Sequence, residues 1–219
     1  MMKYEELLSR ILNDLGISFN QEQIKQTLRF VSEIEIFNPK YKLVGAEGDD
    51  ILIRHIGDCL AAVPIIEKLI EGKENATFAD IGSGAGFPGI VLAIAFPNHK
   101  FTLIERMNRR VGFLNNVIAA LRLNDRVRVI PQDLKDVDET FDIVTFRAFH
   151  PLFEVLDDIS KISNEDTFIC AYKAKVDRLL AELEIVEETC VVKWNFNIED
   201  LDVPLLDATR KLCVLKKKA

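Results

Sequence analysis

The feature that most constrains the fold is a glycine-rich turn between an apolar strand and a helix. Residues 78–89 read FADIGSGAGFPG, so a short buried strand runs directly into closely spaced glycines. Glycine is needed where a backbone turns sharply and approaches a ligand without Cβ atoms in the way. Pro88 suits the first turn of a following helix. The segment therefore predicts a strand, a ligand-binding turn and a helix in direct succession.

After Asn75 the chain alternates between short apolar strands and helices, which predicts βαβ units and a parallel sheet with helices on both faces. The expected strands are Thr77–Ile81, Phe101–Glu105, Val127–Ile130, Phe141–Thr145 and Thr167–Tyr172. The expected helices are Gly89–Phe96, Arg106–Leu121, Leu152–Lys161 and Val176–Ile185. Two β-rich runs, Cys190–Phe196 and Leu212–Lys216, have no periodic helix between them and predict one antiparallel strand near the C-terminus.

The first seventy residues show helical periodicity instead. A first helix covers Tyr4 to Leu15, and a second begins after a capping pair formed by Asn20 and Gln23. Pro39 predicts the end of that second helix at Asn38. A third helix begins near Ile51, and Pro64 is expected to kink or break it. We therefore expect a helical extension at residues 1–72 and a sheet domain at residues 73–219, packed as one compact unit.

Composition limits the class of protein. The chain has 48% hydrophobic residues and a net charge of −7, which is typical of an ordinary globular protein. Acidic residues follow the initiator methionines at once, so no secretory signal is expected. The longest apolar run is interrupted by Pro88 and Gly89, so we expect no membrane partner. The four cysteines form no C-x-x-C pair, which favours idle thiols in a cytoplasmic protein and no metal site.

The acidic net charge argues against a nucleic-acid partner, but the charge is unevenly distributed. Residues 100–130 hold seven basic residues and only two acidic ones. A solvated helix face explains such a segment as well as an RNA-binding surface does. Charge alone leaves both interpretations open.

Two acidic residues indicate which ligand the turn binds. Glu105 closes the second strand, where a carboxylate accepts hydrogen bonds from ribose hydroxyls in both NAD and S-adenosylmethionine enzymes. Asp80 lies two residues before Gly82, where it would repel a pyrophosphate and match the methionine ammonium of S-adenosylmethionine. The pattern therefore favours S-adenosylmethionine over a dinucleotide, and an NAD oxidoreductase is the less favoured class.

Four motifs in register resemble the RsmG family, also called GidB, the bacterial 16S ribosomal RNA guanine-N7 methyltransferases. Residues 80–90, DIGSGAGFPGI, are close to the glycine-loop signature of the family. Residues 54–60, RHIGDCL, are similar to its R-H-x-x-D-S-L. Residues 109–114, RRVGFL, and 141–148, FDIVTFRA, are similar to K-R-x-x-F-L and F-D-x-V-x-x-R-A. The order and spacing hold from about Asn38 to Lys173.

The resemblance implies a class I S-adenosylmethionine-dependent methyltransferase fold, α/β and Rossmann-like, with an N-terminal helical extension. It implies methyl transfer to N7 of a guanine in 16S ribosomal RNA of the small subunit. The alternatives are a small-molecule methyltransferase and a non-catalytic scaffold bound to ribosomes. In both of these the chain keeps the cofactor fold.

The resemblance and the sequence pattern together define the expected site residues. Arg147 is expected to position the reactants, near the methionine end of the cofactor or the target base. The expected cofactor-binding residues are Asp80, Gly82, Gly84, Gly86, Phe87, Glu105, Asp133, Leu134, Lys135 and Arg147. The expected RNA-binding residues are Asn38, His55, Asp58, Arg106, Arg109, Arg110 and Lys173, with Arg122, Arg126, Arg128 and Lys216–Lys218 as further backbone contacts.

The chain departs from the family at one segment that bears on cofactor recognition. Asp133-Leu134-Lys135 stands where the family has R-A-E, so Asp133 is a candidate to accept from the adenine amino group in place of the missing acid. His55 and Asp58, three residues apart on a helix, share a face. They are expected either to bind RNA or to orient this helix against the glycine turn.

The reaction is consistent with what the sequence lacks. Guanine N7 carries a lone pair and no proton, so no general base is expected, and positioning and exclusion of water supply most of the rate. The sequence has no cysteine pair suited to pyrimidine carbon methylation and no N-P-P-Y-type segment after the fourth strand. An arginine donor near guanine O6 is chemically sensible.

Overall fold

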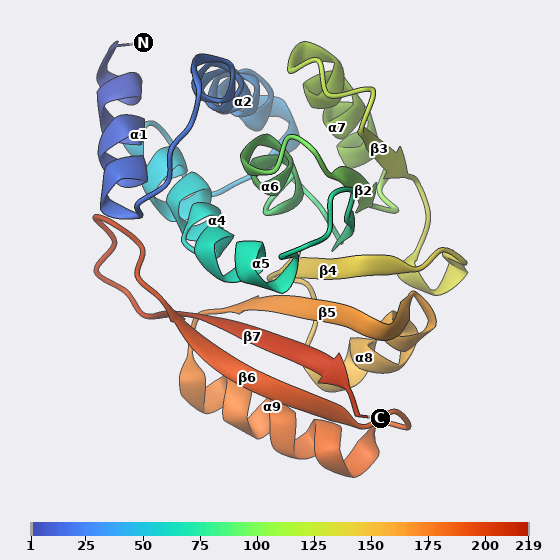
Figure 1. Cartoon of the computed structure of the whole chain (residues 1–219). Coiled ribbons are helices and arrows are strands. Elements are labelled where there is room, and N and C mark those ends of the chain that lie inside the picture. The colour runs from blue at the N-terminus through green and yellow to red at the C-terminus, as the bar shows by residue number, and fades with distance from the viewer. Residues whose placement is uncertain (1, 219) are drawn as a thin grey trace.

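The computed structural model describes residues 2–218 and contains one seven-stranded sheet with helices on both faces (Figure 1). The strand order is β3-β2-β1-β4-β5-β7-β6. The strands are β1 Thr77–Ile81, β2 Lys100–Ile104, β3 Val127–Ile130, β4 Phe141–Arg147, β5 Ser163–Lys173, β6 Trp194–Leu201 and β7 Arg210–Lys217. Among the strands of residues 2–218, β7 alone runs opposite to the other six, because it pairs antiparallel with both β5 and β6. The predicted mostly parallel sheet with one antiparallel strand near the C-terminus is confirmed.

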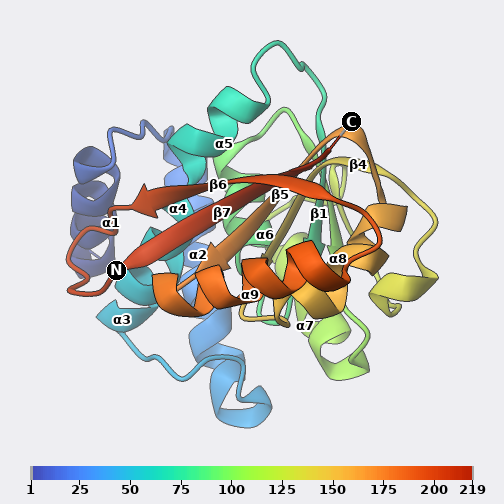
Figure 2. The same ribbon diagram turned by 90° about the horizontal axis from the view of Figure 1, so that it is seen from below.

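Side chains alternate between the two faces of the central strands, and each face has its own core. Phe78 belongs to the core formed with α6 (Gly89–Ala95) and α7 (Asn108–Ala120). Ala79 and Ile81 belong to the opposite core, formed with α8 (Leu152–Lys161) and α9 (Val176–Thr189). Figure 2 shows α8 and α9 together on one side of the sheet. Helices on both faces explain why the strands read as nearly continuous apolar runs.

Two of the predicted strand boundaries were wrong, one on the central strand β4 and one on the edge strand β6. Strand β4 continues to Arg147 because Arg147 still pairs with Tyr172 of β5. Strand β6 begins at Trp194 rather than at Cys190, because α9 extends to Thr189 and Cys190 serves as its C-terminal cap. The β-rich composition of residues 190–193 suggested a strand, but these residues have no ladder partner in β7 until Trp194 pairs with Lys217.

The N-terminal helices pack on the same face as α6 and α7. Helix α1 covers Met2–Asp14 and α2 covers Gln21–Tyr41, and the predicted capping pair between Asn20 and Gln23 is present. One apolar cluster joins Ile11 and Phe30 of these helices with Phe78 of the sheet. The predicted division at residue 72 lies in the turn between α5 (Val63–Leu69) and β1.

The predicted end of the second helix at Asn38 was wrong. Pro39 lies inside the last turn of α2, which ends when Lys42 adopts a left-handed conformation with φ +50° and donates its N–H to the carbonyl of Asn38. A proline inside a helix lacks the N–H that would bond the carbonyl four residues earlier, and its ring crowds that carbonyl. Pro39 therefore weakens the helix at one hydrogen bond but does not end it, because the Lys42 N–H still closes a turn beyond the proline.

The next helical segment contains a wide turn. It consists of α3 (Asp49–Ile51), the π-helix η1 (Leu52–Gly57) and α4 (Asp58–Leu60). The break expected at Pro64 falls at Ala61–Ala62, because Pro64 stands in the first turn of α5, where its missing N–H costs nothing. Single π turns inside helices often occur at functional sites, and this one carries His55.

Candidate active site

The glycine turn lies tightly against its surroundings. Gly82 has φ +62°, and a Cβ atom at this position would lie 2.2 Å from the ring of Phe149. A Cβ atom on Gly89 would lie 2.6 Å from a carboxylate oxygen of Asp80 and 2.4 Å from Leu103. Gly82 is therefore required by its backbone conformation, and Gly89 is required by the close approach of the helix to the strands.

The buried Asp80 carboxylate accepts hydrogen bonds that hold the glycine turn together. One oxygen of its carboxylate accepts from the Ser83 hydroxyl and, at 3.0 Å, from the Gly89 N–H; the other lies 3.4 Å from the Thr145 hydroxyl. The side chain is 1% exposed, and this burial raises the pKa of Asp80 to about 7. Because the carboxylate lies beneath the turn, its predicted contact with a methionine ammonium requires the turn to open and stays a prediction.

Glu105 ties the glycine turn to the beginning of α7. One carboxylate oxygen accepts from the Gly84 N–H at 3.0 Å, and the other accepts from the Met107 N–H at 2.8 Å. The Arg110 guanidinium lies 3.7 Å away. Glu105 is 4% exposed, yet it borders a cavity at the carboxyl ends of β1 and β2. Glu105 therefore lies beside this cavity at the end of β2, and its contact with ribose hydroxyls stays a prediction.

We call this cavity the turn cavity; its volume is about 470 Å³. It brings together Gly82, Glu105, Asp133 and Leu134, all predicted as cofactor-binding residues. Asp133 caps the short helix η2 (Leu134–Asp136) and pairs with Arg106 at 3.3 Å. The other six predicted cofactor residues are not among the residues that line it: Asp80, Gly84, Gly86, Phe87, Lys135 and Arg147.

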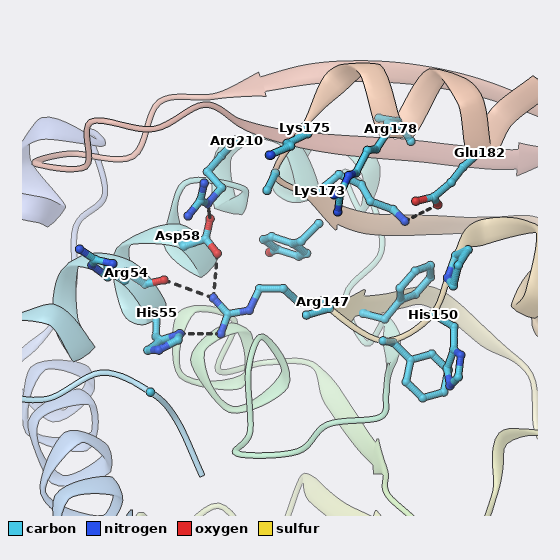
Figure 3. A pocket seen from close by; sticks show the side chains of 18 of the residues that line it. Arg54, His55, Asp58, Arg147, His150, Lys173, Lys175, Arg178, Glu182 and Arg210 are labelled. Carbon is cyan, nitrogen blue, oxygen red and sulfur yellow. Dashed lines mark hydrogen bonds and ion pairs between the residues drawn. The ribbon is translucent and has the colours of Figure 1, made fainter. Parts of the chain in front are cut away.

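A second and larger cavity, of about 730 Å³, lies beside the first (Figure 3). We call it the arginine cavity, after Arg54, Arg147, Arg178 and Arg210 in its wall. The two cavities share residues 148–150, the segment that follows β4. Phe149, whose half-buried ring lies against Gly82, lines both of them.

Arg147 is the centre of a polar network in the arginine cavity. It donates to the Asp58 carboxylate at 2.7 Å, to the Arg54 carbonyl at 3.4 Å and to Nδ1 of His55 at 2.9 Å. Its guanidinium carbon also lies 5.1 Å from the centre of the Phe87 ring. Arg147 therefore joins the end of β4 to the segment with the π turn and to the glycine turn.

The two helical partners of Arg147 are held in their own right. The second oxygen of Asp58 pairs with Arg210 at 3.2 Å, so both oxygens of this buried carboxylate are used. The His55 ring stacks on Phe87 at 5.0 Å. Burial and the nearby Arg147 lower the pKa of His55 to about 4. His55 is thus neutral at pH 7, and it accepts through Nδ1 and carries its proton on Nε2.

Some predicted RNA-binding residues lie elsewhere. The amide of Asn38 donates to the Val44 carbonyl and accepts the Val44 N–H, each at 3.0 Å, which orders the loop after α2. Arg109 lies over the ring of Tyr41 on the outside of α7. Arg126 is half-buried beside the Phe96 carbonyl. Lys173 does line the arginine cavity.

Several residues of the arginine cavity were not predicted as site residues from the sequence, among them Lys175, Arg178, Glu182 and Arg210. Lys175 follows the end of β5, and a cation just past a strand end was a usable signal. Glu182 and Arg210 have no local signal, because the packing of α9 and the pairing of β7 with β5 bring them to the cavity only through the fold.

A topology of β3-β2-β1-β4-β5-β7-β6, a glycine turn after β1 and a carboxylate after β2 define a class I S-adenosylmethionine-dependent methyltransferase. A human methyltransferase 10 domain containing protein has a similar fold, with a TM-score of 0.59 at 15% identity, over 87% of this chain and 97% of that one. The family model GidB, rRNA small subunit methyltransferase G, matches residues 23–213, and the chain belongs to this family.

Two relatives named ribosomal RNA small subunit methyltransferase G agree with this assignment. The protein of Francisella philomiragia is 31% identical over the full length of both chains. That of Borrelia hermsii is 33% identical over 85% of this chain and 87% of its own. The predicted family, fold, enzyme class and cofactor are confirmed. No helix among residues 2–218 is long and apolar enough to cross a lipid bilayer.

Proposed function

We propose that this enzyme methylates N7 of a guanine in 16S ribosomal RNA, with the small ribosomal subunit as its partner in the cytoplasm. The observation that carries the proposal is the pair of cavities that meet at residues 148–150. Parallel sheets bind ligands at the carboxyl ends of their strands, and both cavities lie there. One cavity suits a nucleoside cofactor, and the other suits a base.

The turn cavity fits S-adenosylmethionine. Its volume of about 470 Å³ lies within the usual range for cavities that bury a small molecule. Glu105 offers carboxylate oxygens to ribose hydroxyls, and Asp133 and Leu134 border the space for an adenine. The bound cofactor would supply a methyl group on a positively charged sulfur. Gly84, Gly86 and Phe87 belong to the glycine turn, and Lys135 lies in η2; all four remain predicted cofactor-binding residues.

The protein's own residues act by binding and orientation. Guanine N7 needs no proton removed before it reacts, and His55, neutral through physiological pH, need not serve as a base. Arg147 is a positioning residue here, because its guanidinium fixes the π turn against the glycine turn. Phe149, between the cavities, limits water where they meet.

An extruded or unpaired base suits the arginine cavity better than a paired one, because an enzyme that modifies a base must first reach its reacting edge. The cations Arg54, Lys175 and Arg178 in its wall favour the phosphates that accompany such a base. A small molecule could also enter this space, but cations in excess of acids favour a nucleic acid.

Mapping of N7-methylguanine in ribosomal RNA tests the proposed function. RNA from cells that lack the gene should miss one N7-methylguanine of the 16S RNA, and a plasmid copy should restore it. Chemical cleavage at this modified base, followed by primer extension, identifies the position. Unchanged methylation in the deletion strain would contradict the proposal. Methylation of a metabolite by the pure enzyme would then favour the small-molecule alternative, and no turnover would favour the scaffold.

The basic face of α7 should contribute to subunit binding. We expect Arg109→Glu to weaken binding to small ribosomal subunits by about 3- to 10-fold near 0.1 M salt, since a lost phosphate contact reduces the salt slope by about one unit. Filter binding across a salt series measures this. Arg10→Glu on α1, where Arg10 is exposed and makes only a weak ion pair, is the matched control. Equal binding by both variants would refute the role of α7.

A further inference from the structure

The arginine cavity contains an ion pair that has no role in the methyl transfer proposed above. The Lys173 ammonium at the end of β5 lies 2.6 Å from a carboxylate oxygen of Glu182 on α9 (Figure 3). Both side chains are mostly buried, with 14% and 19% exposed, and both line the cavity. A charge pair is costly to bury, so its position in a ligand cavity calls for a reason.

Glu182 has spare capacity to accept hydrogen bonds. Its oxygen Oε2 accepts from Lys173 and from the Leu152 N–H at 2.9 Å, whereas Oε1 has no hydrogen-bond partner within residues 2–218. The other carboxylate in the wall, Asp58, spends both oxygens on Arg147 and Arg210. Glu182 is therefore the carboxylate of this cavity that can receive a ligand's N–H groups.

A cation beside a carboxylate complements one particular base edge. With N7 directed to the reacting group, guanine offers an acceptor, O6, next to N7 and then the donors N1–H and N2–H₂. Adenine offers a donor where guanine has O6. Enzymes that act on an extruded base read it through hydrogen bonds to its Watson–Crick edge. A lysine followed by a carboxylate matches guanine and mismatches adenine in this orientation.

We propose that Glu182 selects guanine by accepting hydrogen bonds from N1–H and N2–H₂ of the target base, while Lys173 donates to O6. This inference rests on the proposed function and names the residue that determines base specificity within it. Glu182 reaches the base, but it does not take part in bond making or breaking at N7.

The test must separate base recognition from the structural contact that Glu182 makes. Through the Leu152 N–H, Glu182 also holds the beginning of α8 and the segment 148–150. Glu182→Gln keeps a carbonyl oxygen for this N–H, but it replaces the other oxygen with an amide that repels the donors of guanine. Glu184→Gln, on the exposed side of the same helix, is the matched control. Thermal unfolding and S-adenosylmethionine binding should match wild type in both variants.

The experiment measures kcat/KM on small subunits reconstituted with guanosine or with inosine, which lacks the N2 amino group, at the mapped position. We expect Glu182→Gln to lower kcat/KM on guanosine by about 10- to 100-fold, the usual value of hydrogen bonds to a charged group. Replacing guanosine with inosine should lower kcat/KM about 10-fold for the wild type and for Glu184→Gln. For Glu182→Gln the same replacement should lower kcat/KM by less than about 3-fold, because this variant has already lost the interaction with the N2 amino group.

Two outcomes would overturn the assignment. If inosine lowers kcat/KM by the same factor in the wild type and in Glu182→Gln, Glu182 does not contact the N2 amino group. If Glu182→Gln methylates guanosine as fast as the wild type, the carboxylate plays no part in recognition. A wild-type enzyme that methylates no 16S RNA would refute the proposed function itself, which distinguishes that failure from either of these.

Discussion

Arg147→Met is expected to lower the free energy of unfolding by about 3 kcal/mol and to reduce methyl transfer at least about 100-fold, because it breaks a buried ion pair and leaves Nδ1 of His55 and one oxygen of Asp58 without their donor. The Arg147 and Asp58 side chains are only 16% and 6% exposed. Methionine retains much of the packing volume against Phe87 and removes three hydrogen bonds. Urea unfolding and methylation of small subunits measure the two effects.

Activity should fall further than stability alone explains. Arg147 connects the end of β4 with His55 and Asp58, and this connection positions both cavities relative to the glycine turn. The control is Arg10→Met on the exposed face of α1, which should change stability by less than about 0.5 kcal/mol. Full activity of Arg147→Met would show that the network is structural only and that the target base is oriented elsewhere.

Asp80→Ala should abolish measurable S-adenosylmethionine binding and lower the free energy of unfolding by about 3 kcal/mol or more, since each buried polar group left without a partner costs about 1–3 kcal/mol. The substitution leaves the Ser83 hydroxyl and the Gly89 N–H without their hydrogen-bond acceptor. Asp80→Asn keeps an acceptor there, and we expect it to bind the cofactor within about threefold of wild type. Calorimetry with S-adenosylmethionine distinguishes the two variants.

A different result for Asp80→Asn would be equally informative. Loss of cofactor affinity with a normal unfolding curve would mean that the carboxylate charge reaches the methionine ammonium, as the sequence predicted. Normal cofactor binding by Asp80→Ala would refute the role of Asp80 in holding the turn.

The raised pKa of Asp80 predicts how its stability contribution changes with pH. Burial raises the pKa to about 7, above the ordinary value of 3.8, so the folded state holds the proton more tightly than the unfolded state. The contribution of Asp80 to the free energy of unfolding is therefore fully present below pH 3.8 and is lost as the pH rises through about 7. Wild type should lose stability relative to Asp80→Asn between pH 4 and pH 7, and parallel thermal unfolding of both proteins checks this.

The parts of the fold that were predicted correctly are those with strong local patterns. Strand β1, the glycine turn and α6 follow one another within 19 residues of sequence, 77–95, and each has its own chemical signature. The Asn20–Gln23 cap is likewise a short-range hydrogen-bond pattern. One error lies where a distant partner decides, because β6 begins where β7 offers Lys217. The other is local, because α2 continues past Pro39 until Lys42 adopts a left-handed conformation.

The site residues likewise divide into those with a local sequence signal and those without one. Glu105 and Asp133 were found because acids at the ends of strands meet at the ligand-binding edge of a parallel sheet. Asp58 and His55 were singled out as a pair on one helix face, but nothing local showed that Arg147 is their shared partner. The distance between Asp58 and Arg147 is 89 residues along the chain and 2.7 Å in space.

The sequence by itself determined the sheet-and-helix order, the glycine turn and the family, because these depend on patterns within about twenty neighbouring residues. Only the tertiary structure decided which residues line the arginine cavity. Arg210 from the antiparallel strand, Glu182 from α9 and Arg147 from β4 meet in one cavity. The physical reason is that strand pairing and helix packing set these distances, and they act between segments that have no mark of each other in the linear sequence.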